Sequence, residues 1–163
     1  MQREPLVEIT RETLSRLIRG SYTDLYRAAQ NLGENITWQP LDRGRSALDQ
    51  IQEAAGFALL GAEIFEQQAM PPFDPEGMNR LRANHDTPEK ALTLLEEASA
   101  KLASALEIFP PEKLDHRIIL PFGDGAERSF AEIAMLIYWN TVYHEGQVNY
   151  IETLIDYVPV KEN

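Results

Sequence analysis

A single histidine lies on the apolar face of the helix that residues 129–156 are expected to form. Apolar residues recur there at spacings of three and four, which is one face of an α-helix, and His144 falls on that face. Asn140 lies one turn before it and Gln147 nearly one turn after it. Because buried polar side chains need partners, two interpretations are open: a core histidine satisfied by hydrogen bonds, or one ligand of a metal site built between helices.

A second unusual position lies in the helix that begins near residue 46. Ser46 is expected to cap this helix, with Asp49 in its first turn, where the helix dipole favours an acid. Glu53 is followed on one helix face by the apolar residues Phe57, Leu60 and Ile64, at spacings of four, three and four. An acid that leads an apolar line is unusual, so Glu53 is a candidate for a polar role.

Four helices are expected to position these side chains. The first covers about residues 10–32, the second begins at Ser46, the third ends near residue 108, and a Ser129–Glu132 capping box opens the fourth. Residues 69–85 form a long connection, either a lid over one end of the bundle or a slack surface crossing, and we favour the crossing. Residues 116–125, with a Gly-Asp-Gly turn, predict a short hairpin or extended loop.

The remaining polar and aromatic candidates have plainer interpretations. Trp38 is expected to plug one end of the bundle, and His85 and His116 are expected on the surface. Residues 1–9 are expected to be a loosely held lead-in.

Composition narrows the function classes. The chain has 163 residues, which predicts one domain, and its net charge is −11, which is unlike a protein that binds nucleic acid or an anionic membrane. With no cysteine there is no disulfide, thiol nucleophile or zinc–thiolate site. No apolar run is long enough to span a membrane and no signal peptide is evident, so a cytoplasmic protein is expected.

Residues 143–151, Tyr-His-Glu-Gly-Gln-Val-Asn-Tyr-Ile, resemble the last-helix motif of the DinB-like (DinB/YfiT) superfamily of bacterial four-helix-bundle proteins, many of them regarded as metalloenzymes. That motif reads His-x-x-x-His, one charged residue, then Gly-Gln. The family also has a ligand histidine about seven residues after a serine that follows a Trp-bearing loop, and the loop from Trp38 to Ser46 fits. The resemblance implies an all-α antiparallel four-helix bundle, with the hairpin between helices three and four.

The resemblance also implies a site between helices two and four. The three ligand positions of the family correspond to Glu53, Asn140 and His144, with Gln147 as a second-layer partner. A carboxylate and an imidazole suit zinc, nickel or manganese, whereas the amide of Asn140 is a weak ligand. Without metal, Glu53 could instead hydrogen-bond the imidazole and raise its pKa, as a buried ion pair or a general-base dyad.

Two function classes follow. The first is a metal-dependent transferase or hydrolase acting on a small molecule; the second is a metal-free protein that binds a small ligand or serves as a structural homodimer. The dimer is predicted from a second apolar line on the last helix, opposite the His144 face, because a helix that is apolar on two sides needs cover on both. That line comprises Leu136, Trp139, Tyr143, Gly146, Tyr150 and Leu154.

Overall fold

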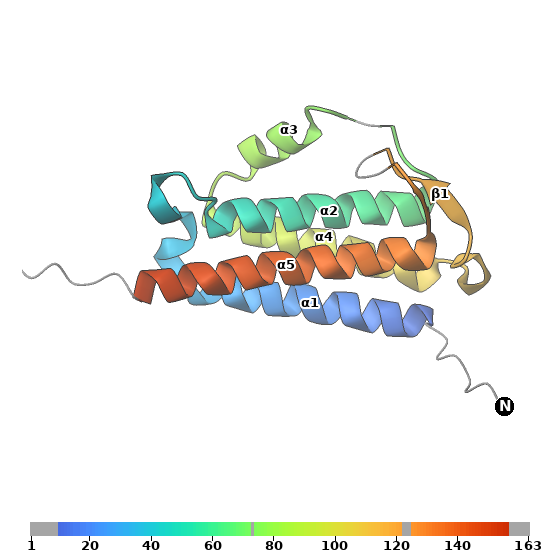
Figure 1. Ribbon diagram of the computed structural model, residues 1–163, viewed down its shortest axis with the longest axis horizontal. Coiled ribbons are helices and arrows are strands. Elements are labelled where there is room, and N and C mark those ends of the chain that lie inside the picture. Colours follow the sequence, from blue (N-terminus) through green and yellow to red (C-terminus); the bar gives the residue numbers. More distant parts are fainter. Residues whose placement is uncertain (1–9, 73, 122–124, 157–163) are drawn as a thin grey trace, which may run out of the picture.

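The computed structural model describes residues 10–72, 74–121 and 125–156, and their four long helices form a bundle (Figure 1). These helices are α1 (Arg11–Asn31), α2 (Ala47–Gln67), α4 (Pro88–Ile108) and α5 (Phe130–Asp156). The predicted all-α four-helix bundle is confirmed. In the described ranges, no helix is both long and apolar enough to cross a membrane.

Local sequence signals set the helix ends. Ser46 accepts a hydrogen bond from the backbone N–H of Asp49, and the Asp49 carboxylate accepts one from the backbone N–H of Ser46. Ser129 and Glu132 form the same reciprocal pair at the start of α5. These capping boxes satisfy N–H groups that have no partner inside a helix. Gly33 follows the C-terminal end of α1 with φ +53°, a conformation that favours glycine.

The order of the helices around the bundle differs from their order in the chain. α2 packs against α4 and α5, and α1 packs against the same two helices, so α1 and α2 lie diagonally opposite each other. Figure 1 shows that α2 and α4 run in the same direction, as do α1 and α5. The predicted antiparallel arrangement therefore holds for α2 with α5 and for α1 with α4, but not for the other two pairs. The reason is that the connection after α2 carries the chain back along the bundle before α4 begins.

This connection is not the slack crossing that we favoured. It contains the helix α3 (Gly77–Asn84), which lies along α2. Gln52 Nε2 donates to the backbone carbonyl of His85 at 2.7 Å. Gly56 permits the contact, because a Cβ there would lie 2.4 Å from Met78 Cε. His85 is accordingly half-buried, and not exposed as expected.

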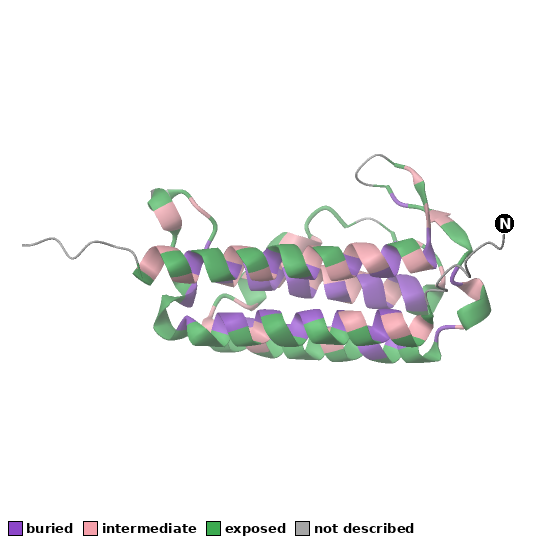
Figure 2. Cartoon of the chain, turned by 60° about the horizontal axis from the view of Figure 1, so that its bottom comes forward, coloured by how far each residue is buried: buried purple, intermediate pink, exposed green. Residues whose placement is uncertain are grey.

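The core runs the length of the bundle between the helices (Figure 2). At the end near the hairpin, Phe65, Phe109 and Phe130 pack with ring centroids 4.8–5.8 Å apart. At the other end, Trp38 is half-buried against the core, which agrees with its predicted packing role.

The predicted hairpin is also present. β1 (Arg117–Ile119) pairs antiparallel with β2 (Glu127–Ser129), and His116 just before it is exposed as expected. Two residues of the predicted Gly-Asp-Gly turn, and the predicted lead-in at residues 1–9, lie outside the described residues. Short 3₁₀ segments complete the connections: η1 (Gly33–Thr37), η2 (Pro40–Asp42) and η3 (Pro111–Lys113).

Candidate functional site

His144 is buried in the bundle with one nitrogen bonded and the other free. Its exposed fraction is 1%, and its Nδ1 lies 2.6 Å from Gln50 Oε1 on α2. The amide oxygen can only accept, so Nδ1 carries the proton and donates it. Nε2 therefore bears a lone pair, and it has no hydrogen-bond partner among the described residues. The structure thus holds one defined tautomer of a neutral imidazole.

Glu53 approaches the free nitrogen from α2. Its Oε1 lies 3.7 Å from His144 Nε2, so the expected approach of these two residues is confirmed. The distance is too long for a hydrogen bond, so the directly hydrogen-bonded Glu53–His144 pair, which was one of the open alternatives, is not the arrangement that the structure has. The other oxygen, Oε2, is turned toward two guanidinium groups. It pairs with Arg45 and lies 3.4 Å from Arg82 Nη2.

The electrostatic balance keeps His144 neutral. Burial lowers the pKa of the imidazole, because a charged ring would lose its hydration. The Glu53 carboxylate raises that pKa, while the positive charge of Arg45 lowers it again. The net pKa lies below the ordinary value, which is the opposite of the rise expected for a Glu53–His144 ion pair. The arginine pairing of Glu53 explains the difference, since its negative charge is already compensated.

Asn140 and Gln147 contribute acceptors that have no partner. Asn140 Oδ1 and Gln147 Oε1 are buried, and within the described residues neither makes a hydrogen bond. Gln147 does lie close enough to His144 to raise the pKa of the imidazole. The hydrogen bond that fixes the ring comes from Gln50, and the role of Gln147 as a second-layer partner stays a prediction. Gln50 lies one turn before Glu53 on the same face of α2, so its i, i+3 spacing was a signal that could have found it.

The donor set does not fit a catalytic transition metal. Nε2 and Oε1 are spaced suitably, because two ligands about 2.1 Å from one ion at a tetrahedral angle lie about 3.4 Å apart. Only one imidazole and one carboxylate are available, however, and no group of three His, Cys, Asp or Glu gathers in the described ranges. Two guanidinium charges already hold the carboxylate, and amide oxygens are weak ligands for zinc or nickel. The roles of Glu53, Asn140 and His144 as metal ligands stay a prediction.

An open groove lies beside this cluster, between the start of α2 and the outer side of α5. Its volume is about 590 Å³, which is within the range of small-molecule sites. Arg45, Gln50 and Gln147 supply its polar part, and His144 lies behind the two glutamines. The lining residues are Pro40, Arg45, Gln50, Val142, Tyr143, Gly146, Gln147, Tyr150 and Ile151.

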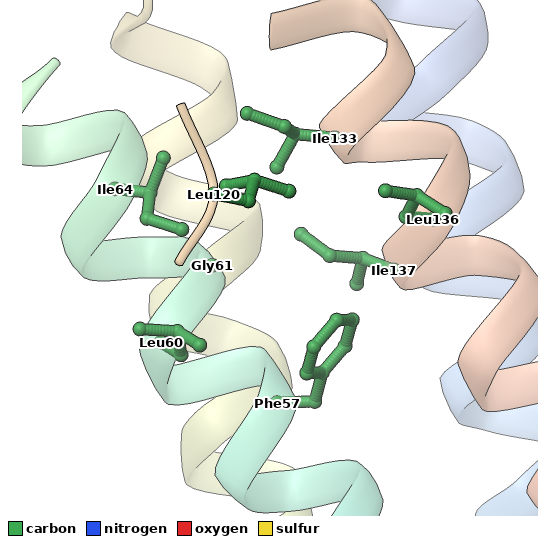
Figure 3. Close-up of a pocket in the computed structure, with 8 residues that line it drawn as sticks. All are labelled: Phe57, Leu60, Gly61, Ile64, Leu120, Ile133, Leu136 and Ile137. Atoms are coloured by element: carbon green, nitrogen blue, oxygen red, sulfur yellow. The ribbon is translucent and has the colours of Figure 1, made fainter. Parts of the chain in front are cut away.

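A second pocket between α2 and α5 is a packing feature. Figure 3 shows its apolar side chains, which come from α2, α5 and the segment after β1. Its volume is about 10 Å³, no more than one water needs. Gly61 allows the helices to approach here, because a Cβ would lie 2.5 Å from Ile137 Cδ1. We assign no ligand to this pocket.

Two charged residues that contact Glu53 were not among the predicted site residues. Arg45 immediately precedes the Ser46 cap, and Arg82 is delivered by α3 from a segment 29 residues further along the chain than Glu53. No local pattern indicates that Arg82 reaches α2, because its position depends on the path of the whole connection.

The bundle matches solved structures at low sequence identity. YfiT from Bacillus subtilis, described as a probable metal-dependent hydrolase with an unusual four-helix bundle topology, is 13% identical; its TM-score is 0.74, and the match covers 95% of this chain and 94% of YfiT. The mycothiol-dependent maleylpyruvate isomerase and a mutant of it match with a TM-score of 0.68 and 16% identity, over 86% of this chain and 61% of the isomerase. The sequence matches no protein-family model and no curated protein. The DinB-like fold implied by the sequence resemblance is therefore confirmed.

Proposed function

We propose that this chain binds a small organic molecule in the groove between α2 and α5, and that binding requires no resident metal. The observation that carries the proposal is the place of Arg45. It lines the groove and at the same time pairs with Glu53, whose carboxylate lies 3.7 Å from His144 Nε2. A positively charged side chain in the wall of the groove favours the binding of an organic molecule over the binding of a metal cation.

The fold neighbours support a small-molecule function in general terms. One of them is named for maleylpyruvate, a small molecule, and the other is described as a probable metal-dependent hydrolase. For this chain, a metal-dependent transferase or hydrolase is the second candidate. It is favoured by the three buried acceptors without partners, His144 Nε2, Asn140 Oδ1 and Gln147 Oε1. Glu53, Asn140 and His144 would then hold zinc, nickel or manganese.

The proposal gives His144 a supporting role. Its Nδ1–H bond to Gln50 fixes one polar wall of the groove, because the Gln50 side chain both holds the imidazole and lines the groove. Nε2 is sealed from solvent, so we assign it no reaction step.

Gly146 offers a direct test of the groove. A Cβ at Gly146 would meet nothing within 4 Å, so Gly146→Phe should fold and fill the groove. Gly20→Phe is the matched control, since Gly20 is also helical, exposed and free of neighbours within 4 Å. In a fragment screen by two-dimensional NMR, hits should shift the Gln50 and Gln147 side-chain amides. These shifts should vanish in Gly146→Phe and persist in Gly20→Phe. Hits that survive Gly146→Phe, or no hits near these amides, would refute the proposal.

We also propose a homodimer through the outer face of α5. Four of the large apolar side chains exposed in the described residues lie on this helix: Trp139, Val142, Tyr143 and Tyr150. The rings of Trp139 and Tyr143 stack with centroids 5.6 Å apart. The alternative is that the long connection or the hairpin covers this face within one chain. The α3 segment of the connection packs on α2, and Trp139, Tyr143 and Tyr150 remain exposed. A two-fold partner is the commonest cover for such a face. Because Val142, Tyr143 and Tyr150 also line the groove, the partner would lie over the groove and close it from outside.

A further inference from the structure

We propose that the ligand of the groove is a small carboxylate with an apolar or aromatic body, held through Arg45. The inference rests on the proposed function, because it names the chemistry of the molecule that the groove takes. It is drawn from the charge of the cluster, the free donors of Arg45 and the walls of the groove.

The cluster carries an uncompensated positive charge. Arg45 and Arg82 both contact the carboxylate of Glu53, so two positive charges face one negative charge. Asp49 is nearby, but its carboxylate accepts from the backbone and hydroxyl of Ser46 at the start of α2. The Asp49 carboxylate is therefore already stabilised by the positive end of the α2 dipole. An anion is therefore the ligand that neutralises the cluster.

Arg45 is the guanidinium that can turn toward such a ligand. Its side chain is 43% exposed and lines the groove. Both of its contacts use Nη2, one to Glu53 and one to the backbone carbonyl of Asp49 at 3.4 Å. Among the described residues, its Nε and Nη1 make no hydrogen bond, and a guanidinium edge matches the two oxygens of a carboxylate. If Arg45 shifts toward the ligand, Arg82 still compensates Glu53.

The rest of the groove defines the body of the ligand. Tyr143 and Tyr150 are 49% and 63% exposed, and with Val142 and Ile151 they form apolar walls. Aromatic faces stack on a planar body. Gln147 adds a polar side chain to this wall, although its Oε1 is buried and faces away from the groove space. The site is thus complementary to a flat or apolar carboxylate more than to inorganic phosphate.

The test compares benzoate with benzamide, which has the same shape and no charge, on the full chain by NMR titration. Benzoate should bind at least about tenfold more tightly than benzamide, since an Arg–carboxylate pair adds charge-assisted hydrogen bonds. Arg45→Gln should abolish that preference by weakening benzoate binding much more than benzamide binding, and Arg45→Lys should restore part of it. Arg27→Gln, which removes an exposed charge from α1, is the matched control and should change neither affinity.

The outcomes separate the two proposals. If both compounds bind equally and Gly146→Phe blocks both, the groove is a ligand site and the carboxylate inference is wrong. If neither compound shifts the amides of the groove, the inference and the proposed function fail together for this class of ligand. If inorganic phosphate competes as strongly as benzoate, the site recognises charge alone and the inference is also wrong.

Discussion

The hydrogen bond between Gln50 and His144 provides the sharpest test of how the site is built. Both side chains are nearly inaccessible, with exposed fractions of 3% and 1%, and their polar atoms lie 2.6 Å apart. Gln50→Leu replaces the acceptor with an apolar group of similar size. It removes the partner of the buried Nδ1–H, while Nε2 already has none among the described residues, and stranding one such group costs about 1–3 kcal/mol.

The double variant should recover much of that loss. Gln50→Leu with His144→Leu removes donor and acceptor together, and replacing both partners by apolar groups of similar shape can be nearly neutral. We therefore expect the single Gln50→Leu change to lower the free energy of unfolding by about 1–2 kcal/mol. This corresponds to a fall in Tm of roughly 2–8 °C for a domain of this size. The coupling energy between the two positions should be about 1 kcal/mol or more.

Urea unfolding of the four proteins of this cycle measures the coupling. Gln30→Leu serves as the control, because Gln30 is exposed on α1, and its effect should stay within about 0.5 kcal/mol. A coupling energy below about 0.5 kcal/mol, the limit at which independent sites add, would show that the hydrogen bond does not hold the imidazole. The tautomer assigned to His144 would then lose its basis.

Three further predictions follow from the charges and the open face of the bundle. The pKa of His144 is lower in the folded protein than in the unfolded chain. As the pH falls, the unfolded chain therefore protonates this imidazole before the folded protein does. The free energy of unfolding should therefore fall as the pH drops below about 6.5, and in urea titrations this loss should disappear in His144→Leu. Glu53→Gln should lower the pKa of His144 further and Arg45→Gln should raise it, which an NMR titration of the imidazole can follow; equal signs would contradict the charge assignments. Tyr150→Glu should convert a dimer to monomers in sedimentation, whereas wild-type protein that sediments as a single species near 18.5 kDa would refute the dimer.

The helices of the fold could be predicted from the sequence because their signals are local. Apolar spacing placed the buried face of α5 correctly, and two capping boxes marked the starts of α2 and α5. The parallel direction of α2 and α4 could not be predicted in this way. It depends on the path of a long connection, and α3 within that connection is only eight residues long and has no buried residue.

The site was only partly predictable, because some of its contacts depend on the path of the long connection and not on local sequence patterns. The resemblance brought Glu53 and His144 together correctly, because both positions belong to helices whose packing the fold determines. It did not indicate which groups balance the charge of the Glu53 carboxylate. The alternative of an ion pair that raises the imidazole pKa therefore does not hold. Arg82 reaches Glu53 only through the tertiary path of the connection, and no spacing along the chain indicates such a contact.

Benzoate binding before and after removal of metal ions tests the central claim most directly. The protein should be purified without a histidine tag, assayed for zinc, nickel and manganese, and then dialysed against a chelator. We predict well below one metal ion per chain and a benzoate affinity that changes by less than about twofold after chelation, since the free energy involved is under about 0.5 kcal/mol. Close to one bound ion per chain, with benzoate binding lost on chelation and restored by that ion, would contradict the account.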